Sequence, residues 1–147
     1  MLKESLIEIF ERDLNKLAAE INLYKDDSSL WIVKEGIGNS GGNLCLHLIG
    51  NLNHFIGAIL GGSGYVRERD KEFSLKDISR ADLIVGIENT IPLVKNSLNN
   101  LKAEDFEKTF PVEIFGRAQK TDFILVHLAT HLTYHLGQIN YHRRLLA

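Results

Sequence analysis

Cysteine and proline are both scarce in this 147-residue sequence. The single cysteine, Cys45, excludes an internal disulfide and any zinc site built from several cysteine ligands. Only two prolines, Pro92 and Pro111, are present, and no stretch rich in proline and glycine divides the chain. Because this length suffices for one ordinary hydrophobic core, we expect residues 1–147 to form a single domain.

An excess of charge and a long hydrophobic run are also missing. The 17 Lys and Arg residues are balanced by 19 Asp and Glu residues, and the formal net charge is −2. Two close cationic pairs are present, Arg67 with Arg69 and Arg143 with Arg144. Such pairs are too small to follow a phosphate backbone, so nucleic acid is not an expected partner. No run approaches the roughly 18 apolar residues of a membrane span, and acids near the amino terminus are unlike a signal peptide. We therefore expect a cytoplasmic protein without a membrane partner.

What the sequence does contain is apolar residues at three- and four-residue steps, the pattern of amphipathic helices. Four helices are expected, over residues 2–25, 43–60, 80–101 and 121–146. Ser79 and Thr121 are suitable amino-terminal caps for the third and fourth helices, and Pro92 should kink the third. Four helices of this kind predict an all-α fold, a four-helix bundle.

The expected connections between these helices are long. Residues 26–42 form a loop or short turn, 61–73 a glycine-hinged loop, and 102–120 an irregular segment with a small hairpin turning at Gly116. Segments of this length that lack secondary structure of their own often carry functional sites. We therefore expect the long connections to build a pocket at one end of the bundle.

Six histidines are the most informative feature, and they divide between the second and fourth expected helices. On the fourth helix His127, His131 and His135 are spaced by four residues, a step of about 40° around a helix that turns about 100° per residue. Two imidazoles four residues apart can reach one ion, but a third ligand must come from elsewhere. His47 is the natural candidate, because it lies within the apolar second helix, where an unpaired imidazole is costly. The spacing alone leaves the pairs His127/His131 and His131/His135 equally suitable.

These residues also admit other interpretations. Each histidine could be a core residue with one hydrogen bond, and Cys45 is best read as a small core hydrophobe. The run from His131 to His135 lacks the glutamate that a zinc protease needs as its general base. A ferritin-like di-iron site is excluded because the fourth helix has no acid after Asp122.

Three runs of sequence resemble the DinB-like metal-dependent superfamily, and one of its uncharacterised bacterial branches in particular. They are HLTYHLGQINYHRRLL (131–146), NSGGNLCLHLIGNL (39–52) and RERDKEF (67–73). The resemblance implies a DinB-like four-helix bundle, often a homodimer, with one divalent ion bound by three histidines. It places these ligands at His47, His131 and His135, and so selects between the two pairs that spacing left open. Zinc and nickel are the preferred ions among those that imidazole suits.

The resemblance also implies a chemistry. Relatives with known activity resemble glutathione-independent thiol transferases and isomerases, which use a low-molecular-weight thiol such as bacillithiol or mycothiol. The resemblance thus suggests a metal-dependent thiol S-transferase, or a hydrolase, with a small-molecule substrate. The electrophile is expected to enter between the 61–73 loop and the 102–120 connection. The alternatives are a non-catalytic, metal-stabilised dimeric bundle and a module that binds a small anion.

Four further residues are candidates for the surroundings of the ion. Gln138 lies on the histidine band and could fix an imidazole tautomer. His54 is seven residues from His47 and could line the mouth of a pocket. Arg67 and Arg69 could bind a substrate carboxylate.

Overall fold

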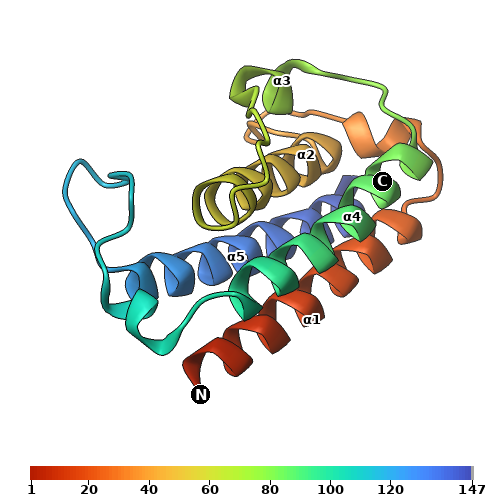
Figure 1. The fold of residues 1–147 in the computed structure, drawn as a ribbon. Coiled ribbons are helices and arrows are strands. Elements are labelled where there is room, and N and C mark those ends of the chain that lie inside the picture. The colour runs from red at the N-terminus through yellow and green to blue at the C-terminus, as the bar shows by residue number, and fades with distance from the viewer. Residues whose placement is uncertain (147) are drawn as a thin grey trace.

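The computed structural model describes residues 1–146, and the long helices lie side by side in a bundle (Figure 1). The long elements are α1 (Leu2–Leu23), α2 (Gly41–Leu52) continued by the π-helical η2 (Asn53–Leu60), α4 (Arg80–Asn99) and α5 (Thr121–Leu146). Shorter turns of helix are η1 (Ser28–Trp31), α3 (Arg69–Ser74) and η3 (Ala103–Glu107). The four long elements confirm the predicted all-α, four-helix architecture.

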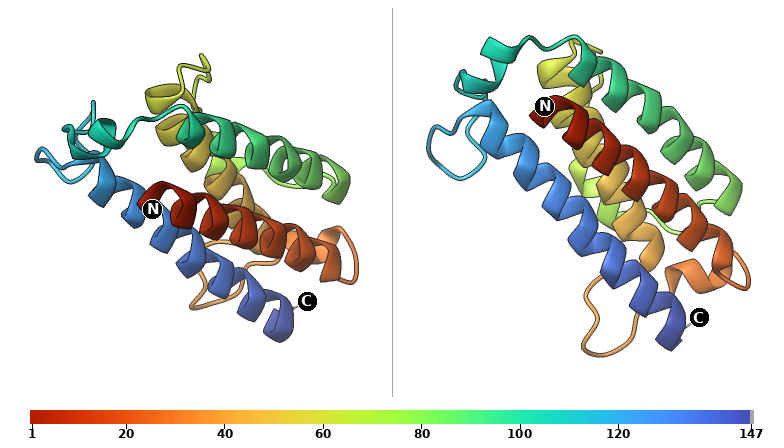
Figure 2. Two further views of the ribbon diagram at one scale, coloured as in Figure 1. Left: turned by 60° about the horizontal axis from the view of Figure 1, so that its bottom comes forward. Right: turned by 90° about the horizontal axis from the view of Figure 1, so that it is seen from below.

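The packing of the four long helices leaves α2 and α5 in contact. Helix α1 packs between α4 and α5, while α2 lies against both α4 and α5 (Figure 2). Side chains such as Phe10, Leu48 and Leu132 are completely buried in one core that all four helices share. Burial of these apolar stripes is the main force that fixes which helices touch. The contact between α2 and α5 brings together the two helices that carry the histidines.

The second helix begins two residues before the predicted start and ends at the predicted residue 60, but its last part is π-helical. Ser40 caps it, because its hydroxyl accepts a hydrogen bond from the Asn43 backbone N–H at 3.1 Å. The widened π-helical turn of η2 follows α2 without a break, a geometry that hydrophobic periodicity does not reveal. The segment Gly41–Leu60 has the length and composition of a membrane span, but 56% of its most apolar window is buried inside the bundle, as in a core helix.

A short helix, α3, lies within the segment that the sequence suggested was only a glycine-hinged loop. Six residues are too few to form a stable isolated helix, so α3 depends on tertiary contacts. The buried Asn43 side chain of α2 provides two of them, donating to the carbonyls of Glu72 at 2.9 Å and Leu75 at 2.8 Å. Helix α3 is therefore tied to the first turn of α2 (Figure 1).

The predicted ends of the last two long helices are correct to within two residues. Ser79 caps α4 as expected, accepting from the Asp82 N–H at 3.1 Å, and the helix continues on both sides of Pro92. The predicted role of Thr121 is wrong. Thr121 is itself helical, and its hydroxyl donates to the Lys108 carbonyl at 2.9 Å, which anchors the preceding loop instead of capping α5.

The long connections were expected at one end of the bundle, but they lie at opposite ends. The connection after α1 and the connection before α5 are separated by the length of the helices (Figure 1). In the latter, Thr109 pairs with Lys120 in an isolated antiparallel bridge, and Gly116 turns the chain with φ of 71°. Only glycine adopts this backbone conformation without strain, so the expected turn at Gly116 is present.

Candidate metal centre

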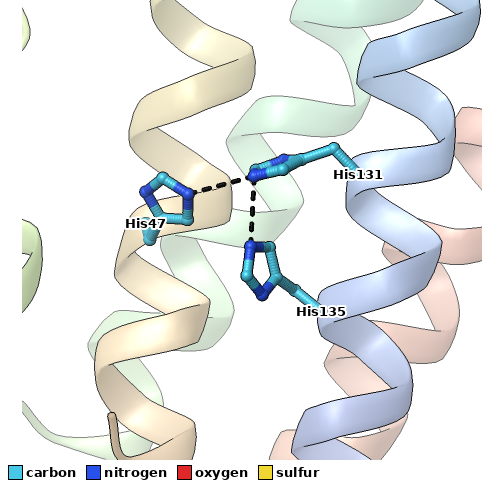
Figure 3. A group of neighbouring side chains, drawn as sticks. All are labelled: His47, His131 and His135. Atoms are coloured by element: carbon cyan, nitrogen blue, oxygen red, sulfur yellow. Dashed lines mark hydrogen bonds between the residues drawn. The ribbon is translucent and has the colours of Figure 1, made fainter. Parts of the chain in front are cut away.

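Three histidines from two helices converge at the α2–α5 contact. Figure 3 shows His47 reaching from α2 toward His131 and His135, which project from successive turns of α5. One ring nitrogen of each histidine lies within 4.8 Å of the corresponding nitrogen of the other two. His47 is 7% exposed, whereas the other two rings are half-buried, so the cluster lies beneath the surface with one side accessible.

The same ring nitrogen of each histidine faces the centre of the cluster. Nε2 of His131 is 3.2 Å from Nε2 of His47 and 3.1 Å from Nε2 of His135. The other nitrogen of His47, Nδ1, is 3.0 Å from a Glu72 carboxylate oxygen, and Nδ1 of His135 is 2.7 Å from Gln138 Oε1. Both partners present oxygen atoms, which accept, so these contacts favour in each ring the tautomer with the proton on Nδ1 and a lone pair on Nε2.

This donor set fits a divalent cation. Two nitrogen ligands at about 2.05 Å from a tetrahedral zinc ion are about 3.3 Å apart, close to the 3.2 and 3.1 Å that separate His131 Nε2 from Nε2 of His47 and of His135. Without a cation, His131 Nε2 has one hydrogen at most to share between two facing lone pairs. The chemistry of the three nitrogens therefore matches a site for an ion such as zinc or nickel, with a coordination position left for another ligand.

Burial keeps two of the rings neutral. The pKa of His131 is lowered to about 3, first by burial and then by the neighbouring His135 and His47. Burial also lowers the pKa of His135, although the hydrogen bond to Gln138 acts in the opposite direction. Only a neutral imidazole can donate a lone pair to a metal, so these shifts keep both rings competent as ligands at neutral pH.

A buried ion pair lies behind His47. Glu72 of α3 is 6% exposed, and its two carboxylate oxygens accept from Arg67 Nη2 and Nε at 2.9 Å each. Burial alone would raise the pKa of Glu72, but hydrogen bonds from His47 and Arg67 outweigh it and lower that pKa. Glu72 is therefore an ionised acceptor for the His47 ring.

Comparison with known proteins assigns this chain to a family. The sequence profile of the family described as "Protein of unknown function (DUF1572)" matches residues 3–147. The chain belongs to the DUF1572 family. No protein with a curated functional description matches it significantly.

The DUF1572 chain has a DinB-like fold. It superposes on the crystal structure of a DinB-like protein from Bacillus cereus ATCC 10987 with a TM-score of 0.74 and 17% sequence identity, over 96% of this chain and 90% of the other. At this identity the likeness shows the fold alone. The fold implied by the three sequence runs is thus confirmed, whereas thiol chemistry is not addressed by it.

The other residues that the sequence singled out in this DUF1572 protein are dispersed. Gln138 contacts His135 as described above. His54 lies on η2 and packs its ring against Phe55, with ring centres 4.7 Å apart, and burial and Arg67 lower its pKa. His127 is outside the cluster of three nitrogens, and its ring centre is 6.2 Å from that of His131.

The two arginines, candidates for binding a substrate carboxylate, contact groups of the protein itself. The Arg67 side chain is only 11% exposed and is directed at Glu72, within the protein. Arg69 is exposed and stacks over the ring of Phe73 at 5.2 Å. Sequence reasoning missed Glu72 because one acid in a charged run carries no sign of burial, although Glu72 lies in RERDKEF, one of the three runs that carry the resemblance.

A cavity of about 440 Å³ adjoins the cluster. It lies between residues 36–39 of the loop after η1 and the carboxy-terminal half of α5, not between the 61–73 and 102–120 segments as expected. Its lining residues are Gly36, Ile37, Gly38, Asn39, Leu44, Tyr134, His135, Gln138, Tyr141, His142 and Leu145. His135 is thus both a member of the histidine cluster and part of the cavity wall.

Proposed function

We propose that this protein binds one divalent metal ion through Nε2 of His47, His131 and His135 and activates a low-molecular-weight thiol for transfer to an electrophile. The observation that carries the proposal is the convergence of three Nε2 atoms beside a cavity that His135 lines. The resemblance to DinB-like enzymes that use bacillithiol or mycothiol supports the choice of a thiol. The volume of the cavity is that of an ordinary small-molecule site.

The role of the ion follows from general chemistry. A dication bound by three neutral imidazoles supplies an open position at which a thiol is deprotonated at neutral pH. In the transfer, the thiol sulfur forms a bond to the electrophilic carbon while the bond to the leaving group breaks. The thiol proton is released to solvent and the leaving group departs with its electron pair, so no oxidant or reductant is required.

The protein itself offers no cysteine nucleophile for this reaction. Cys45, the single cysteine, is completely buried in the core. Burial raises the pKa of its thiol to about 12, so it remains protonated at neutral pH. A thiol nucleophile must therefore come from outside the chain, in agreement with the proposal.

The cavity is suited to an uncharged electrophile. None of its lining residues is an aspartate, glutamate, lysine or arginine. The two tyrosines, Tyr134 and Tyr141, offer exposed ring faces, and Asn39 and Gln138 offer amide hydrogen bonds. Apolar or aromatic substrates bind such surfaces by contact area and stacking, without a charge to neutralise.

The ligand assignment predicts the metal content of four variants. His47→Ala, His131→Ala and His135→Ala should each lose most of the bound metal, because two imidazoles hold a dication much less tightly than three. His127→Ala is the matched control and should retain nearly one ion per chain. Atomic absorption of protein dialysed against zinc and then against metal-free buffer measures this. Equal losses from His127→Ala and His135→Ala would show that the wrong α5 pair was assigned.

Catalysis predicts that turnover requires both metal and an added thiol. A panel of thiols is reacted with an uncharged aromatic electrophile, and product is followed by absorbance with metal-loaded and metal-stripped protein. Loaded protein should be at least tenfold faster, and Cys45→Ser should retain full activity. Equal rates for loaded and stripped protein would instead support the non-catalytic alternative, in which the ion only links α2 to α5.

A further inference from the structure

A carboxylate on α3 contacts the ring of His47. Glu72 accepts from His47 Nδ1 at 3.0 Å while it is held by two hydrogen bonds from Arg67. The Glu72 and Arg67 side chains are 7% and 11% exposed, so the ion pair is almost removed from water. Buried ion pairs add little to stability relative to apolar side chains of the same size. A contribution to stability therefore does not explain why the Glu72–Arg67 pair is buried.

Helix α2 is shaped to receive this carboxylate. Gly50 lies one turn beyond His47, and a Cβ at that position would overlap the Glu72 carboxylate. Asn43 lies one turn before His47 and holds the backbone carbonyl of Glu72 at 2.9 Å. These two residues of α2 fix both the backbone and the side-chain position of Glu72. The Glu72 carboxylate thus fits into the space that Gly50 leaves open, and His47 lies between Gly50 and Asn43 on the same helix.

A second residue of α3 holds the same ring. Phe73 packs against His47 with ring centres 4.9 Å apart, and Arg69 covers the Phe73 ring. The imidazole of His47 is therefore held by a hydrogen bond to one residue of α3 and by packing against the next. All of these contacts come from the run 67–73.

We propose that segment 67–73 is the positioning element of the metal centre, and that Glu72, oriented by Arg67, is the residue that keeps Nε2 of His47 free for the ion. The inference rests on the proposed metal site. A carboxylate that accepts from Nδ1–H fixes the tautomer and orientation of the ring and increases the basicity of Nε2. Arg67 acts through Glu72, to which its two hydrogen bonds run at 2.9 Å, while its Nη2 lies farther, at 3.4 Å, from His47 Nδ1.

The test is zinc affinity in Glu72→Gln and Arg67→Met, measured by competition with a chromophoric chelator. Loss of a partner of this kind weakens metal binding by about 10–100-fold, so both variants should show such a decrease while still binding one ion at saturation. Glu68→Gln, an exposed acid of the same segment, is the matched control and should match the wild type. Circular dichroism and thermal unfolding check that each variant folds.

A second measurement does not depend on metal. Long-range ¹H–¹⁵N NMR of the metal-free wild type should show His47 protonated at Nδ1 at pH 7.5, and Glu72→Leu should change that tautomer. A ring protonated at Nε2, or affinities of Glu72→Gln and Arg67→Met within twofold of the wild type, would overturn the role of segment 67–73 and leave the metal site standing. A wild-type protein that binds no zinc would overturn the proposed function itself, and the titration thus separates the two failures.

Discussion

A histidine can present either ring nitrogen to a ligand, and the partner of the other nitrogen selects between them. In this protein the partners are side chains outside the cluster, Glu72 for His47 and Gln138 for His135. Among the described residues, His131 Nδ1 has no such partner, and it is a buried atom. The rings of His47 and His135, whose Nδ1 atoms have partners, thus flank the ring of His131. The orientation of the His131 ring depends on packing and on what its Nε2 binds.

Two glycine substitutions test whether the position of the Glu72 carboxylate affects zinc binding. Gly50→Ala should displace the Glu72 carboxylate, because the new Cβ would overlap it, and should weaken zinc binding by about tenfold. Gly137→Ala on α5 meets no atom within 4 Å and should raise stability by about 0.5–1 kcal/mol, with zinc affinity unchanged. Chelator competition and urea unfolding give the two values. A Gly50→Ala protein with wild-type affinity would show that Glu72 tolerates displacement.

Among the secondary-structure elements, the long helices and the short ones were predictable to different degrees. α1 and α5 each bury a stripe of residues at three- and four-residue spacing, and their ranges were predicted almost completely. Helix α3 was not, since six residues show no periodicity and its contacts come from Asn43, far away in sequence. The π-helical η2 was missed for a related reason, because an apolar run gives the same pattern in an α-helix and in a π-helix.

The contact between α1 and α5 includes a buried carboxylate that makes stability depend on pH. Asp13 is 1% exposed and accepts from Thr133 Oγ1 at 2.5 Å and Arg12 Nε at 2.8 Å. Burial opposes its ionisation, but these hydrogen bonds outweigh burial and lower the pKa of Asp13 below its ordinary value. Its contribution is therefore complete above the unfolded-state pKa of about 3.9 and is lost as the pH falls through the lower folded-state pKa.

Asp13→Asn should accordingly lower the free energy of unfolding by about 1–3 kcal/mol at pH 7. The difference from the wild type should narrow as the pH falls below about 3.9, where the wild-type carboxylate also becomes protonated. Urea unfolding at pH 7 and pH 3 measures it, with the exposed Glu8→Gln of the same helix as control. A difference in the free energy of unfolding that is the same at pH 7 and pH 3 would mean that the charge of Asp13 contributes nothing to stability.

For the molecule as a whole, the proposed ion links two helices far apart in sequence, α2 through His47 and α5 through His131 and His135. An ion that binds only the folded chain stabilises it by about 2.7 kcal/mol at a free concentration of one hundred times Kd. For a chain of this size that corresponds to a rise in Tm of about 5–11 °C. Differential scanning calorimetry with and without zinc measures the rise. It should vanish in His131→Ala, and an equal rise in that variant would place the bound zinc elsewhere.

The sequence alone predicts the four long helical segments, the histidine band and the membership of His47 in a buried helix, because all three follow from local periodicity. The tertiary structure determined which residues contact the histidine band of α5. Helix packing brings His47 opposite His131 and His135, and α3 folds back so that Glu72 reaches His47 while Arg67 turns inward. It also places the cavity beside the loop at 36–39. These are contacts between residues distant in the chain, and they depend on how whole helices pack, which no spacing within one segment encodes.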